Sequence, residues 1–231
     1  MSCRLLSVTL DVSDPAPAAQ FWAALIGREI IADARGLLLP GSETQAGLRF
    51  APSESARLGP DPIHLHLLTE PGHDQQETVA VALRLGARPL DVGQLPDEPH
   101  VVLADPAGNP FCVIEPGNAF LAGCGPLAEL ACDGGRAVGL FWAAALEWPL
   151  VWDRDEETAV QSPAGGTKVA WGGPPDAPKR GRSRQRLDLR ANGDLAAEVD
   201  RLVGLGAAVL GSTGGGVELA DPGGNEFFLT A

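Results

Sequence analysis

The sequence predicts an α+β protein made by tandem duplication, in which each half contains two βαβββ units. Three observations lead to this prediction. Short segments of the chain recur at a fixed spacing, strand and helix patterns follow one another in the same order within each copy, and each copy ends in the same turn motif.

The repeats define the two copies, because self-similarity at a fixed spacing is typical of duplicated structures. FWAA at residues 21–24 recurs at 141–144, and LGA at 85–87 recurs at 205–207, each 120 residues later. The pattern ADPxGNxF, which begins at Ala104, recurs 116 residues later. The junction between the copies therefore lies near the middle of the chain.

We place this junction at residues 117–126 and predict two domains, 1–118 and 119–231. The chain has 231 residues, so two domains of ordinary size are allowed.

The first unit begins with a strand and a helix. Between residues 6 and 12, apolar residues alternate with polar ones, which predicts a strand with one apolar and one polar face. Asp14 is a suitable helix cap and Pro15 suits the first turn. Apolar residues then recur with helical spacing from 18 to 25, and Gly27 ends the helix. We expect this helix to cover the apolar face of the strand.

Three short strands and a second unit follow. The strands are expected near 29–33, 36–39 and 46–51, before a loop over 52–62. Residues 63–67 alternate in polarity and predict the opening strand of the second unit. Its remaining elements are a helix near 74–85 and strands near 99–104 and 110–115, which flank the turn at 105–109.

Composition restricts the partners and the compartment. The formal charge is −13, which repels nucleic acid and anionic membrane surfaces and favours neutral or cationic small ligands. The first 14 residues are too short and too often interrupted by Asp for a signal peptide or a membrane span, so we expect a cytoplasmic protein. None of the four cysteines forms a CxxC pair, and reduced thiols are expected.

Four segments carry a family resemblance: SDPAPAAQFW at 13–22, HLHL at 64–67, LGAR at 85–88 and ADPAGNPFCVIEP at 104–116. In this order and spacing they resemble the glyoxalase/bleomycin resistance protein/dioxygenase superfamily, also called vicinal oxygen chelate (VOC) proteins, in its glyoxalase-like branch. The resemblance covers essentially the whole chain, twice.

The resemblance implies tandem VOC domains, each of two βαβββ units that form a curved mixed sheet. Helices lie on the convex side and the ligand lies on the concave side. Many members have one such domain and dimerise, so this chain is expected to be a monomer with an internal pseudo-dimer, or a homodimer.

Metal-using relatives supply a His from the first strand, a second donor from the strand that opens the second unit, and a Glu from the last strand. The matching positions are Ser7, His64 and Cys112 in the first copy and Leu127, Arg186 and Phe228 in the second. Only His64 matches the family pattern, and a stable site needs several converging donors. We therefore expect no metal and no other cofactor.

His64 and His66 point to the same side of their strand because side chains alternate with period two. Three interpretations stay open: a metal pair completed by a carboxylate, residues that contact a ligand, or a histidine pair without a function. Cys112 and His64 are the candidate catalytic residues, because a nucleophilic thiol needs a neighbouring base. The alternative is that Cys112 is a small buried apolar residue.

Charged residues alternate along the matching strand of the second copy. Arg186 and Asp188 are candidate ligand-binding residues, and Glu129, which matches Thr9, is the expected partner of Arg186. The basic run from 179 to 190 lacks interleaved aromatic residues, which favours a solvated linker over a nucleic-acid site.

Other ligand-binding candidates come from the polar face of the first strand and from aromatic residues near short strands. They are Ser7, Thr9, His66, Phe50, Trp152 and Trp171. Aromatic side chains commonly line ligand pockets, although core packing is an equal alternative for both tryptophans. The first copy is expected to hold the better pocket, because Arg186 and Phe228 are bulky replacements for His64 and Cys112.

Two functions follow as expectations. The first is metal-independent binding or sequestration of a small organic molecule, as the resemblance to bleomycin-resistance proteins implies. The second is a glyoxalase-type lyase or isomerase that uses His64, His66, Cys112 or Glu115 as acid and base groups or as metal ligands.

Overall fold

The computed structural model describes residues 3–55, 58–69, 72–95, 97–172, 179–213 and 215–231. These residues form two eight-stranded mixed sheets and four helices, which confirms the α+β class. No helix among them has the length and apolar character needed to cross a membrane.

The predicted βαβββ order occurs four times, and we number the units along the chain. Unit 1 contains β1 (Cys3–Val12), α1 (Pro15–Ile26), β2 (Ile31–Asp33), β3 (Gly36–Leu39) and β4 (Gly47–Pro52). Unit 2 contains β5 (Ile63–Leu68), α2 (Gln75–Arg84), β6 (Arg88–Pro89), β7 (Val101–Ala104) and β8 (Pro110–Ile114). Unit 3 contains β9 (Leu127–Cys132), α3 (Arg136–Leu146), β10 (Leu150–Arg154), β11 (Glu157–Gln161) and β12 (Lys168–Gly172). Unit 4 contains β13 (Gln185–Ala191), α4 (Leu195–Gly204), β14 (Ala208–Thr213), β15 (Gly216–Ala220) and β16 (Glu226–Thr230).

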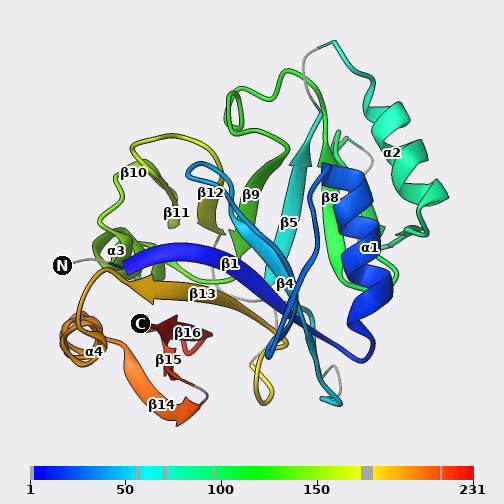
Figure 1. Ribbon diagram of the computed structural model, residues 1–231. Helices are drawn as coiled ribbons and strands as arrows, with labels where there is room; N and C mark the ends of the chain where they lie inside the picture. The colour runs from blue at the N-terminus through cyan, green and yellow to red at the C-terminus, as the bar shows by residue number, and fades with distance from the viewer. Residues whose placement is uncertain (1–2, 56–57, 70–71, 96, 173–178, 214) are drawn as a thin grey trace.

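Each sheet combines one unit from each copy. Sheet A has the order β14-β15-β16-β13-β1-β4-β3-β2 and joins units 1 and 4. Sheet B has the order β10-β11-β12-β9-β5-β8-β7-β6 and joins units 2 and 3. Figure 1 shows the blue β1 beside the gold β13, and the cyan β5 beside the green β9, and both pairs are antiparallel. The two units of one copy therefore lie in different sheets.

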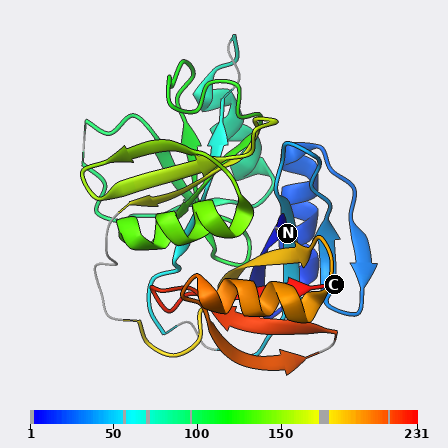
Figure 2. The same cartoon turned by 90° about the vertical axis from the view of Figure 1, so that its left-hand side faces the viewer.

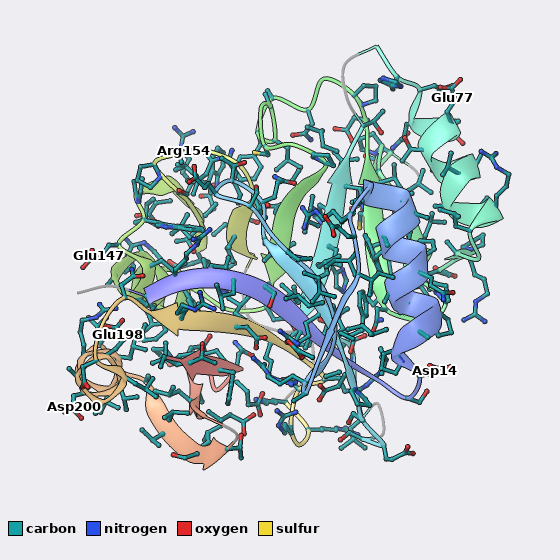
Figure 3. The ribbon with its side chains drawn as sticks, viewed as in Figure 1. Asp14, Glu77, Glu147, Arg154, Glu198 and Asp200 are labelled. Carbon is teal, nitrogen blue, oxygen red and sulfur yellow. The ribbon has the colours of Figure 1, made fainter. Side chains whose placement is uncertain are left out.

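Local sequence explains the first elements. The Asp14 side chain accepts a hydrogen bond from the backbone N–H of Ala16 at 3.1 Å, which caps α1 at the end labelled in Figure 3. Gly27 ends the helix with φ of 66°, a conformation that glycine adopts at little cost. A register shift in β1 between Leu5 and Ser7 places Leu5 in the core. The expectation that Leu6 continues the apolar face was wrong for this reason.

The helices cover one face of each sheet. In sheet A, α1 packs on β3 and β4 while α4 packs on β14 and β16. In sheet B, α2 packs on β8 while α3 packs on β11 and β12 (Figure 2). One hydrophobic core contains residues of both sheets. We call the opposite surface of each sheet its helix-free face.

Two matching hydrogen bonds connect the units of each copy across the sheets. The indole Nε1 of Trp22 donates to Asp105 Oδ2 at 3.0 Å, and that of Trp142 donates to Asp221 Oδ2, also at 3.0 Å. Burial raises the pKa of both carboxyl groups. The repeated turn motif thus anchors the helix of one unit to the last strands of the next.

Candidate functional site

The candidate site lies on the helix-free face of sheet B. As the alternating pattern predicts, Ile63, Leu65 and Leu67 enter the core, while His64 and His66 are partly exposed on the other side of β5. The strand register sets Cys112 of β8 beside His66, and sets Glu129 of β9 on the other side of His66. Lys168 of β12 is the register partner of Glu129. We call Cys112, His66, Glu129 and Lys168 the sheet-B row.

His66 and Glu129 form the central pair of this row. His66 Nδ1 lies 2.7 Å from Glu129 Oε2, and the two side chains are 20% and 9% exposed. Burial lowers the pKa of His66, but hydrogen bonds with Cys112 and Glu129 and the charges of both groups outweigh it and raise the pKa to about 10. The imidazole is therefore cationic at neutral pH.

His64 behaves differently although it lies on the same strand face. Burial and the charge of His66 lower the pKa of His64. Its register partner on β9 is Ala131, which offers no polar group. The two histidines thus carry different charges at neutral pH, and only His66 belongs to the row.

Two aromatic side chains, Phe120 and Trp152, lie beside the Lys168 end of the sheet-B row, and we call them the aromatic wall. Lys168 Nζ donates to the backbone carbonyl of Phe120 and lies 4.0 Å from the centre of the Phe120 ring. The Phe120 ring meets Trp152 edge to face with the centroids 5.9 Å apart. Phe120 belongs to the segment that joins the two copies, so this segment contributes to the site.

A hollow of about 360 Å³ opens beside the wall. Its polar groups include His66 and Glu129, and its apolar surface includes Phe120 and Trp152. The remaining lining residues come from β9, β11 and β12 and are mostly small: Ala131, Glu157, Thr158, Ala159, Ala170, Trp171 and Gly172. Largely apolar walls with few polar groups are typical of ligand pockets.

Cys112 lies outside the hollow. It is 4% exposed and belongs to a small buried cluster with Leu121 and Cys124. Phe120 both packs against this cluster and lines the hollow. Phe120 therefore contacts both the hollow and the buried cluster that contains Cys112, and Cys112 itself does not line the hollow.

The helix-free face of sheet A contains charged groups that bind one another. Asp188, which is 1% exposed, accepts hydrogen bonds at Oδ2 from Thr9 at 2.7 Å and Ser7 at 3.3 Å. Arg35, from the turn between β2 and β3, reaches Asp188 at 2.8 Å and lies 4.5 Å from the centre of the Phe228 ring. The Arg35 side chain therefore covers this part of the helix-free face of sheet A, whereas the helix-free face of sheet B contains a hollow.

Two arginines of the basic run at 179–190 bind carboxylates of sheet A. Arg186 and Arg182 bind the carboxylate of Asp11 at 2.7 and 2.9 Å, and Arg182 also binds Glu218. The expected pair of Arg186 with Glu129 was wrong, because units 3 and 4 lie in different sheets. Glu129 instead binds His66 of the other copy.

The structure changes two further assignments. Phe50 is fully buried in the core on the helix side of β4, so it lies away from any ligand on the helix-free face. The histidine beside Cys112 is His66 rather than His64, because the β5–β8 register pairs His66 with Cys112. Trp152 is 38% exposed at the hollow. Trp171 also lines the hollow, but it is only 2% exposed and stacks on Trp142 in the core.

The residues do not fit the metal site of metal-using relatives. Ser7 lies in sheet A while His64 and Cys112 lie in sheet B, so the three matching positions of one copy do not converge. In the sheet-B row, His66 already binds Glu129, and Lys168 occupies the next position. The described part of the chain contains no group of three or more His, Cys, Asp or Glu placed to hold a metal ion.

A second hollow, of about 190 Å³, lies where the linkers at 58–62 and 179–184 meet the start of α3. Two of its four basic residues bind carboxylates, since Lys179 binds Glu226 and Arg182 binds Asp11 and Glu218. A third, Arg184, donates to the backbone carbonyl of Asp11. It lies away from the sheet-B row, and we do not regard it as the main site.

Sequence reasoning missed Phe120 and Lys168. A signal for Lys168 was present, because Arg49 and Lys168 hold matching places beside Thr9 and Glu129. Phe120 lies in the junction between the copies, where the repeat gives no guide.

Comparison with known proteins is consistent with this geometry. Residues 7–114 and 128–230 each match the family described as "Glyoxalase-like domain". Glyoxalase I from Zea mays has a similar structure, with 16% identity, a TM-score of 0.67, and coverage of 99% of this chain and 92% of that one. A putative dioxygenase from Bacillus subtilis is similar with 14% identity, a TM-score of 0.64 and coverage of 97% and 84%. Comparison with curated proteins gives no match.

Proposed function

The chain belongs to the glyoxalase-like domain family, and from this premise we propose that it binds a small organic molecule in the hollow of sheet B without a metal ion. The observation that carries the proposal is the hollow itself, whose walls include Phe120 and Trp152 and whose polar groups include His66 and Glu129. A largely aromatic ligand, neutral or cationic, suits these walls and the charge of −13.

The donor groups support the metal-independent part of the proposal. His66 and Glu129 bind each other, so a metal ion would have to replace this interaction and displace the proton that joins the two groups. A ligand in this hollow would be held by its contact with the aromatic wall and by hydrogen bonds to the pair.

The experiment is a screen of neutral and cationic aromatic compounds by thermal shift, followed by calorimetric titration of the hits. Trp152→Ala and Glu129→Gln should weaken binding at least tenfold, whereas Arg186→Ala, in sheet A, should leave it unchanged. A chelator should change neither the affinity nor the melting temperature. A stoichiometric metal ion in the purified protein, or hits that depend on Arg186 alone, would refute the proposal.

One observation favours an enzyme as the second candidate: the hollow places an imidazole and a carboxylate 2.7 Å apart at an apolar surface. Such a pair can move protons in a lyase or isomerase reaction. Hits incubated in deuterated water should then exchange carbon-bound hydrogen, followed by NMR, and His66→Gln should abolish the exchange.

We also propose that the protein is a cytoplasmic monomer. The four cysteines are free thiols, which suits a reducing compartment. The central strands of both sheets pair within one chain, so the pairing that single-domain relatives are expected to obtain by dimerising is supplied internally.

A further inference from the structure

We propose that Cys112, activated by His66 and Glu129, captures α,β-unsaturated carbonyl compounds covalently after they enter the hollow of sheet B. The inference rests on the proposed function, because the hollow must first hold the compound. It assigns a reaction to the sheet-B row that simple binding does not need.

The strand register places a thiol beside an imidazole that is itself held by a carboxylate. Glu129 lies 2.7 Å from His66 Nδ1 and so orients the ring, and Cys112 is the register partner of His66 on the other neighbouring strand, β8. Carboxylate, imidazole and thiol follow one another on adjacent strands. In this order the carboxylate holds the imidazole, and the imidazole exchanges a proton with the sulfur.

Neighbouring groups distinguish Cys112 from the other cysteines. Cys112 is the register partner of His66, and a nearby imidazole can take up and return the proton of a thiol. Burial raises the pKa of Cys3 to about 12 and also raises the pKa values of Cys124 and Cys132. No histidine accounts for the pKa of any of those three thiols, so they should remain protonated and unreactive.

The reaction is an addition with no leaving group. The Cys112 thiolate attacks the β-carbon of the activated alkene, forming an S–C bond while the π electrons move to the carbonyl oxygen as an enolate. The His66 imidazolium then donates its proton to the α-carbon. The net change adds the S–H group across the C=C bond, and needs neither an oxidant nor a metal.

The hollow and the wall select the compound. A largely apolar hollow of about 360 Å³ favours an apolar, ring-shaped enone over a polar alkene of equal reactivity. Phe120 lines the hollow and packs on the buried cluster that contains Cys112, so its side chain must move for the sulfur to reach a bound compound. Removal of the ring should therefore speed the addition at saturating enone, although it also removes part of the wall that holds the compound.

The test treats the full chain with cyclohex-2-enone at neutral pH and follows adducts by intact mass and peptide mapping. We expect one adduct, on Cys112, and none on Cys112→Ser. His66→Gln should slow its formation at least tenfold, and Phe120→Ala should accelerate it at saturating enone. His64→Gln is the matched control, because His64 lies on the same strand face but outside the hollow lining and the row, and its rate should equal that of the unaltered chain.

The inference fails if Cys124 or Cys132 reacts first, if His66→Gln reacts as fast as the unaltered chain, or if Cys112 stays unmodified even in Phe120→Ala. It also fails if acrylamide is captured as efficiently, relative to a free thiol, as the enone. Binding of compounds without an activated alkene is measured separately by calorimetry. If these compounds bind but the enone forms no adduct, the covalent capture is refuted and the proposed function stands. If these compounds do not bind, the proposed function is refuted.

Discussion

Glu129→Gln is the change that most directly tests the central pair of sheet B. It replaces a buried carboxylate, 2.7 Å from His66 Nδ1, by an amide of the same shape. The amide still accepts a hydrogen bond from a neutral imidazole but no longer stabilises its positive charge. His66 should therefore lose much of its affinity for a proton.

The magnitude follows from the pKa of His66, which rises from 6.5 to about 10 in the folded protein. Each factor of ten in proton affinity corresponds to about 1.4 kcal/mol, so the protonated imidazole stabilises the fold by at most about 5 kcal/mol. This stabilisation is complete below pH 6.5 and is lost as the pH rises toward 10. Between these limits the stability of the unaltered chain should fall by about 1.4 kcal/mol per pH unit from this group.

The assay is urea unfolding of both proteins at a series of pH values from 6 to 10. At pH 6.5 Glu129→Gln should be less stable by about 3 to 5 kcal/mol, which is the usual cost of removing one partner of a buried ion pair. The difference should shrink to about 1 kcal/mol near pH 10, where half of the His66 imidazole is deprotonated and most of the linked stabilisation is lost. A difference that is constant across the pH range would contradict the assignment of a cationic His66.

Four further outcomes are expected. Trp22→Phe removes the hydrogen bond to buried Asp105 and should cost about 2 kcal/mol, or a fall in Tm of about 4 to 8 °C by calorimetry, and Trp142→Phe should match it because its bond to Asp221 is the same. Gly139→Ala should destabilise the chain by at least about 2 kcal/mol in urea, despite the better helix propensity of alanine, because the added Cβ would lie 1.8 Å from Thr158 Oγ1. Arg35→Ala should cost about 1 to 2 kcal/mol in the same assay, as it removes the 2.8 Å partner of the buried Asp188 carboxylate. Light scattering after gel filtration should give one species of 23.9 kDa, and a dimer would contradict the internal pairing of the sheets.

The order of elements was predictable from sequence because it depends on local periodicity. The helical spacing around Trp22 and its repeat at Trp142 gave both helices, and the period of two in residues 63–67 gave the correct faces of β5. The polar residues on the helix-free faces could be found in the same way. These features require no knowledge of which strands are neighbours.

The composition of the site was less predictable. The partners His66 and Glu129 belong to different copies. The periodicity of one unit predicts its own strands and helix, but it does not predict which other unit lies beside it in the sheet. The pairing of Glu129 with Arg186 was wrong for this reason, and so was the pairing of Cys112 with His64. Phe120 was missed because it acts from a connecting segment rather than from a strand.

The exchange of units between the two sheets has a consequence for how the chain folds and persists. A single copy would leave β1 and β5 without their central neighbours, so two separate copies would have to find each other at a rate that depends on dilution. The segment 115–126 turns that encounter into an intramolecular event, with an effective concentration in the millimolar range. Co-expressed fragments cut within this segment should therefore reassemble only as an obligate heterodimer, whereas the intact chain keeps all eight strands of each sheet together at any concentration.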